Sequence, residues 1–177
     1  MRNLRKLGRF THVAAAIVLD PLISRTHFHM IYATRHLAGL QVFKEVEQKA
    51  MGVMVDAQAE AQQKRRVEGT RQDELFGSRD LYNPRHYQSL RDGYCDKSRR
   101  FTLALLQRRK SVSYDVVWKA AISFPLVWES DLKTWIKQWE SKGTLRVDGL
   151  VGRRRVPQVG QNHILLWRES TTASWPT

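Results

Sequence analysis

Several features that define common enzymes and secreted proteins are missing from this chain of 177 residues. Its only cysteine is Cys95, which excludes an intramolecular disulfide and any zinc or iron–sulfur site built from several cysteines. It has no glycine-rich phosphate loop, paired-carboxylate motif or nucleophile elbow. No apolar run approaches the ~18 residues needed to cross a bilayer. We therefore expect a cytoplasmic protein that is not an enzyme, without catalytic residues, metal, cofactor or membrane partner.

Acidic residues are also scarce, and the chain carries a formal net charge of +13. Residues 96–177 hold fifteen basic and seven acidic residues, whereas residues 41–95 are neutral overall. A charge needed only for solubility would not require this bias towards the last part of the chain. The charge favours nucleic acid as the partner, ahead of an anionic membrane surface. The basic stretch from Gln58 to Arg66 lacks the broad apolar face of a membrane-binding helix, so we discard the membrane.

The first third of the chain predicts a β-hairpin followed by a long helix. His12–Leu19 is rich in alanine and β-branched residues, and Thr26–Thr34 alternates, with Asp20-Pro21 as a break between them. A helix is expected from about Leu37 to Val67. The residues that lie near helical spacing are Leu40, Phe43, Val46, Glu47, Ala50, Val53 and Met54.

The last third predicts helices followed by two strands. Helices are expected over Arg99–Arg109, with Phe101, Ala104 and Leu105 inward, and over Asp115–Ser123. A further helix, capped by Glu129-Ser130, carries one apolar stripe formed by Leu132, Trp135, Ile136 and Trp139. Thr144–Asp148 and His163–Arg168 are typical of strands. Helices followed by a hairpin with a basic tip are typical of a winged helix-turn-helix.

The predicted fold class is therefore α+β, mostly helical. Residues 1–67 form the β-hairpin and long helix, and residues 68–95 a linker with a short helix that begins at Pro84. Residues 96–169 form the winged helix-turn-helix, and residues 170–177 a flexible tail.

Nucleic-acid binding is expected at the last helix and at the loop between the two strands. Lysine contacts phosphate, glutamine pairs with adenine edges, and arginine suits phosphates or a narrow minor groove. The alternative is a helix with solvated charges that mediates only protein contacts. The predicted binding residues are Lys133, Thr134, Lys137, Gln138, Ser141, Arg153, Arg154 and Arg155.

Other chemistry is less favoured by the residue pattern. The tryptophans suit core packing better than base stacking, because all but Trp175 lie at helical or strand spacing. His27 and His29 share a strand face, but exposed strand histidines are commoner than metal ligands. Arg35 and His36 follow a strand, where they either help to bind an anion or cap the next helix; we favour the cap.

Two segments together resemble a known family. They are Phe28–His36 with Gly39–Lys44, and Pro125–Lys133 with the strand His163–Trp167. These segments resemble the C-terminal part of the three-Cys-motif partner proteins, bacterial proteins with a methyltransferase-like domain followed by a winged helix. The resemblance implies that the hairpin corresponds to the last two strands of the methyltransferase-like sheet. Most of that domain, including its glycine loop, is missing here, so we expect either a remnant or fragment, or one half of a split system.

The resemblance and the charge together predict a non-catalytic nucleic-acid-binding module that targets a methyltransferase-like or defence-associated assembly. DNA is favoured over RNA as the target. A protein partner that completes the N-terminal sheet is also expected. The alternative is a protein–protein adaptor that docks a partner chain through the winged helix and the exposed hairpin edge.

Overall fold

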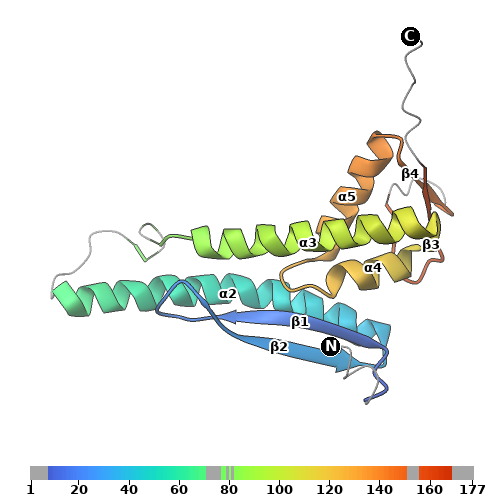
Figure 1. Ribbon diagram of the computed structural model, residues 1–177. Coiled ribbons are helices and arrows are strands. Elements are labelled where there is room, and N and C mark those ends of the chain that lie inside the picture. The colour runs from blue at the N-terminus through green and yellow to red at the C-terminus, as the bar shows by residue number, and fades with distance from the viewer. Residues whose placement is uncertain (1–7, 71–76, 79, 81, 151–155, 169–177) are drawn as a thin grey trace, which may run out of the picture. The chain divides into compact units, whose positions relative to one another are not determined.

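The computed structural model describes residues 8–70, 77–78, 80, 82–150 and 156–168. The fold is α+β, and about 55% of the described residues are helical (Figure 1). The elements in chain order are β1 His12–Leu19, β2 Thr26–Thr34, α2 Leu37–Thr70, α3 Arg85–Arg109, β3 Ser111–Ser113, α4 Tyr114–Ile122, α5 Glu129–Ser141, β4 Leu145–Asp148 and β5 Ile164–Trp167.

The chain divides into two compact units, each described below by itself. The N-terminal unit contains Met1–Cys95 and the returning segment Ser123–Val127. The C-terminal unit contains Asp96–Ile122 and Trp128–Thr177. The predicted short helix and the helix predicted from Arg99 form one continuous helix, α3. The boundary between the two units after residue 95 therefore lies inside this helix.

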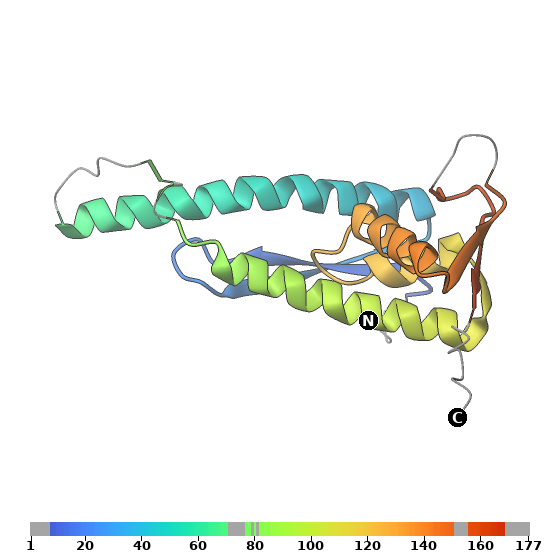
Figure 2. The same cartoon turned by 90° about the horizontal axis from the view of Figure 1, so that it is seen from above.

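The predicted N-terminal hairpin is confirmed. Strands β1 and β2 pair antiparallel, from His12 opposite Thr34 to Val18 opposite Phe28, with an irregularity at Val18/Leu19. Strand β1 is buried along nearly its whole length, whereas β2 is largely exposed. The hairpin runs alongside α2 (Figures 1 and 2). Gly39 in the first turn of α2 allows this close approach, because a Cβ there would lie 3.0 Å from the Tyr32 hydroxyl and the Thr34 Oγ1.

The predicted long helix is also confirmed, but three of the residues at helical spacing, Val46, Ala50 and Val53, face solvent. Val46 and Val53 are 56% and 70% exposed. The buried stripe instead runs through Leu40, Lys44, Glu47, Met51, Gln58 and Ala59. The predicted spacing included Glu47, which is buried, but not Lys44, which lies beside it on the buried face next to Leu40.

Those two charges bind the returning segment within the N-terminal unit. The Lys44 ammonium contacts the Glu47 carboxylate and donates to the Phe124 carbonyl at 2.9 Å. Glu47 Oε1 accepts from the Leu126 N–H at 3.1 Å, and Arg91 donates to the Leu126 carbonyl at 2.6 Å. Leu126 has a φ of 55°, a left-handed backbone that these bonds hold on both sides. We call Lys44, Glu47 and Arg91 the polar clasp.

The C-terminal unit contains a three-stranded sheet with the order β3-β5-β4, and both pairings are antiparallel. Strands β4 and β5 lie where the sequence predicts strands. Strand β3 was missed, because Ser111–Ser113 is only three residues long and shows no measurable alternation. It pairs with β5, with Val112 opposite Leu165.

Helices α4 and α5 supply most of the core of the C-terminal unit. Both helices begin within one residue of their predicted positions. The prediction for α3 was wrong in its orientation: Phe101 is 54% exposed, and the buried residues are Ser98, Thr102 and Leu106. The Ser98 hydroxyl is satisfied inside the core, where it donates to the Ala121 carbonyl at 2.9 Å. Ser98 and Thr102, which have small hydroxyl side chains, therefore occupy the buried face of α3 that the apolar spacing assigned to Phe101.

Among the described residues, no helix combines the length and the apolar character required to cross a membrane.

The polar clasp predicts a specific pattern of stabilities. Lys44→Met leaves the Glu47 carboxylate buried without its cation, and should lower the free energy of unfolding by about 3 kcal/mol. The double variant Lys44→Met with Glu47→Gln buries no charge and keeps an acceptor for the Leu126 N–H. It should therefore be more stable than the single variant in urea unfolding.

Lys49→Met is the matched control, because Lys49 is exposed on the same helix and its loss should change the free energy of unfolding by less than about 0.5 kcal/mol. Equal destabilisation by the single and double variants would contradict the clasp as a buried ion pair.

Candidate nucleic-acid interface

Helix α5 is positioned by polar groups at both ends and by an apolar face. Its N-cap residue is Trp128, not the predicted Glu129-Ser130, and the Asp131 carboxylate accepts the Trp128 N–H at 2.9 Å. After the helix, Gly143 adopts a φ of 69° and donates its N–H to the Glu140 carbonyl. The predicted stripe is confirmed as the buried face, formed by Leu132, Trp135, Ile136 and Trp139.

The five residues predicted to bind nucleic acid on α5 lie on its outer face. Thr134, Lys137, Gln138 and Ser141 are exposed, and Lys133 is half-buried. The two hydroxyls bond to their own helix, Thr134 to the Ser130 carbonyl and Ser141 to the Gln138 carbonyl. Their donors are therefore already used within the helix.

The two lysines on this face differ in their surroundings. Lys133 lies 2.5 Å from the Glu129 carboxylate one turn earlier, which offsets its charge. Within the described part of the chain, Lys137 makes no ion pair or side-chain hydrogen bond, and its side chain is exposed to solvent. Lys137 is therefore the strongest candidate for a phosphate contact.

Gln138 is joined by a residue that the sequence prediction missed. The Arg99 guanidinium on α3 donates to Gln138 Oε1 at 3.0 Å. This bond orients the amide with its N–H₂ group available, and it adds a guanidinium to the outer face of α5. No local pattern identifies Arg99, because the contact joins residues 39 positions apart.

Arg153, Arg154 and Arg155 lie outside the described residues. They belong to the connection between β4 and β5, whose two sides are described. His163 Nδ1 lies 3.1 Å from the Gly149 carbonyl, and the Gly160 N–H donates to the Asp115 carboxylate at 3.0 Å. These contacts anchor the base of the connection.

Four of the tryptophans in the described residues belong to the core and are not available to stack on bases. Trp118, Trp128, Trp135 and Trp139 are buried, and Trp139 packs edge-on against Trp167 with ring centroids 6.2 Å apart. Burial also raises the pKa of the Tyr114 hydroxyl far above its usual range, so Tyr114 is a neutral core residue.

Burial raises the pKa of the Glu140 carboxyl on α5, and the Val147 N–H that bonds to it partly offsets the shift. Glu140 is half-buried and bonded to β4, which ties α5 to the sheet.

The histidines of β2 have other neighbours. His27 Nδ1 lies 3.8 Å from the Asp20 carboxylate, and His29 Nε2 lies 3.3 Å from the Tyr94 hydroxyl. In the described ranges, no three His, Cys, Asp or Glu residues are grouped closely enough to hold a metal ion.

Comparisons of the chain with protein-family models, with curated proteins and with solved structures find no match.

The capping of α5 provides a test of how this helix is positioned. Asp131→Ala removes the acceptor of the Trp128 N–H and should destabilise the protein by about 1 kcal/mol in thermal unfolding. Ser130→Ala should have almost no effect, because the exposed Ser130 side chain does not cap the helix. A larger loss for Ser130→Ala would favour the cap expected from the sequence.

Proposed function

We propose that the C-terminal unit is a winged helix-turn-helix that binds nucleic acid through the outer face of α5. The order α3, β3, α4, α5, β4, β5 supports this proposal, because a winged helix has the same order of helix, strand, two helices and two strands. The sheet order β3-β5-β4 supports it as well, since β4 and β5 form the antiparallel pair that carries the wing. Under this proposal α5 is the recognition helix.

The observation that carries the proposal is the division of α5 into two faces. One face is buried in the core of the C-terminal unit, and the other presents Lys137, Gln138 and the nearby Arg99. A helix with its side chains is about 10–12 Å across and fits the major groove of B-DNA, which is about 12 Å wide. The major groove of an RNA helix is too narrow for it. DNA is therefore the favoured target.

The wider assignment follows from the family resemblance. We propose that the chain is a non-catalytic module, similar to the C-terminal region of the three-Cys-motif partner proteins, that directs a methyltransferase-like or defence-associated assembly to nucleic acid. The net charge of +8 over residues 96–177 supports this role, because phosphate binding draws on lysine and arginine.

The proposal is tested by fluorescence anisotropy with random duplex DNA, single-stranded DNA and RNA at several salt concentrations. Duplex DNA should bind most tightly. Its affinity should fall steeply as the salt concentration rises, because binding releases cations from the DNA phosphates and added salt opposes that release. Lys137→Gln should weaken binding about three- to tenfold and reduce the steepness of the salt dependence by about 1.

Lys49→Gln in the N-terminal unit is the control, since it removes the same charge from an exposed helix position. Equal effects of the two variants would contradict a specific role for α5. A variant with Arg153, Arg154 and Arg155 all changed to alanine should lose most of the binding, and unchanged affinity would remove the wing from the interface.

A second candidate function, a protein–protein adaptor, is favoured by the free edge of β2. The Ala15 N–H points away from β2, because it donates to the Ser123 carbonyl at 3.3 Å. Ala15 and Ile31 are thus a non-hydrogen-bonded pair, as are the pairs two residues on either side. The N–H and C=O groups of His29, Ile31 and Ala33 therefore point to the outer edge, where no strand of the described residues pairs with them.

This edge lacks the usual protection against pairing. Strand β2 has nine residues with no lysine, arginine, acid or proline, and Phe28, Met30 and Ile31 are 48–49% exposed. Natural edge strands are normally blocked by charge, proline or short length. An added partner strand would satisfy the free backbone groups and cover the apolar side chains.

The adaptor function predicts a partner that remains bound at ~0.5 M salt, where phosphate contacts are weak. In the purified complex, hydrogen exchange should slow at the amides of His29, Ile31 and Ala33. The amides of Met30 and Tyr32 are already bonded within the hairpin and should change little. Ile31→Lys should weaken the complex at least tenfold. Unaltered exchange at the three outward amides would contradict docking at this edge.

A further inference from the structure

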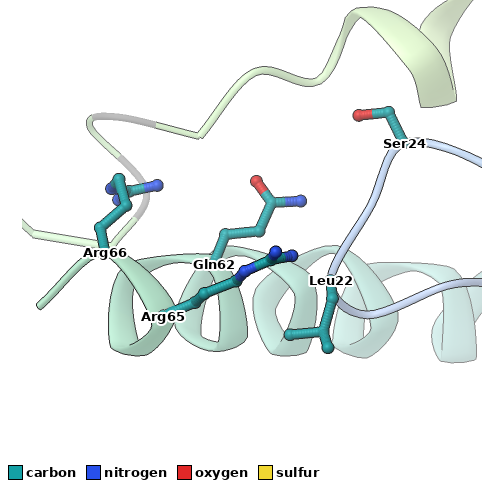
Figure 3. Close-up of a pocket in the computed structure, with 5 residues that line it drawn as sticks. All are labelled: Leu22, Ser24, Gln62, Arg65 and Arg66. Carbon is teal, nitrogen blue, oxygen red and sulfur yellow. The ribbon is translucent and has the colours of Figure 1, made fainter. Parts of the chain in front are cut away.

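A polar hollow lies in the N-terminal unit, between the turn of the hairpin and the second half of α2. Its volume is about 390 Å³, within the range of small-ligand sites. The hairpin turn contributes Leu22 and Ser24, and α2 contributes Gln62, Arg65 and Arg66. Figure 3 shows the Gln62 side chain pointing from α2 towards the turn, with Arg65 extended along the helix towards Leu22.

The turn is held rigidly by Asp20, outside the hollow itself. The Asp20 carboxylate accepts the N–H groups of Leu22 and Ile23 at 3.0 and 3.3 Å. The same carboxylate binds Arg25 at 3.0 Å. The hydrogen bond from the Leu22 N–H is the main cause of the lowered pKa of Asp20. The Asp20 carboxylate therefore stays ionised at neutral pH. This acid is fully engaged by its own turn.

The turn is also tied to α2 one helical turn before the hollow. The Gln58 amide donates to the Asp20 carbonyl, and its oxygen accepts from the Tyr82 hydroxyl at 2.6 Å. Gln58 is buried, so this connection is protected from solvent. The two walls of the hollow are thus joined before any ligand binds, which reduces the ordering required on binding.

The lining has the composition of an anion site. Among the described residues, the lining holds two guanidinium groups, an amide and a hydroxyl, and no carboxylate. In the described residues, Arg65 forms no ion pair, whereas the neighbouring Lys64 lies 3.9 Å from Glu68. A guanidinium presents paired N–H donors that match phosphate oxygens, and its plane also stacks on aromatic rings. Leu22 adds a side chain that is 47% exposed.

We propose that this hollow binds the phosphate group of a nucleotide, with Arg65 as the principal charge and Gln62 and Ser24 as hydrogen-bond donors. The apolar surface of Leu22 and the plane of Arg65 accommodate the attached base. The nucleotide is either free or part of a single strand, and both present the same phosphate chemistry. The site belongs to the N-terminal unit and does not depend on nucleic-acid binding by α5.

The test follows the side-chain Nε–Hε signals of arginine by NMR in the full chain, with the Arg65 signal assigned by its loss in Arg65→Gln. Titration with AMP should shift this signal saturably, whereas adenosine, which lacks the phosphate, should not shift it. In a separate binding titration, Arg65→Gln should weaken AMP binding at least tenfold.

Lys64→Gln is the matched control, because it removes the same charge from the adjacent position of the same helix, and it should change the affinity less than twofold. A ten-nucleotide single strand distinguishes the two sources. Saturation of the Arg65 signal by the strand at lower concentration than by AMP assigns the site to a nucleic-acid backbone, and the reverse order assigns it to a free nucleotide.

Two outcomes would overturn the proposal: equal shifts with AMP and adenosine, or equal weakening by Arg65→Gln and Lys64→Gln. The second outcome would mean that AMP responds only to the general positive charge of the helix. Lys137→Gln should leave the AMP titration of Arg65 unchanged, so a failure of the proposed role of α5 would be recognised separately.

Discussion

The N-terminal unit depends on a buried ion pair that reaches a distant part of its own chain. Lys44 and Glu47 are almost fully buried on α2, where apolar side chains would ordinarily be expected. Burial raises the pKa of Glu47, and the Lys44 ammonium offsets part of that cost. The pair is satisfied only because the segment Ser123–Val127 supplies a carbonyl and an N–H to it. The burial of Lys44 and Glu47 on α2 and the course of the chain after α4 therefore depend on each other.

The same arrangement explains why three valines of α2 are exposed. Once the polar clasp faces the returning segment, helical geometry turns Val42, Val46 and Val53 towards solvent, where they are 56–70% exposed. Strand β2 is exposed in the same unit, with an outer edge that no strand of the described residues pairs and three half-exposed apolar side chains. Apolar surface and unpaired backbone groups in one unit are the features on which the proposed adaptor function rests.

The C-terminal unit differs, because most of the large apolar side chains that the structure describes there are buried. Four tryptophans are buried in this unit, and the outer face of α5 is left to short polar groups and lysine. The local bonds of Thr134, Ser141 and Lys133 rigidify that face and reduce what it offers a ligand. Lys137, with the Arg99–Gln138 pair beside it, is the part that remains available.

The sequence by itself determined the hairpin, the long helix, the positions of α4 and α5 and the buried stripe of α5. Each of these depends on the alternation or periodicity of neighbouring residues, which is local information. Tertiary structure decided the buried face of α2, the orientation of α3, the short strand β3, the contact of Arg99 with Gln138 and the hollow beside Arg65. The physical reason is that these features depend on partners distant in the chain, such as the polar clasp, whose bonds join residues 79 and 80 positions apart.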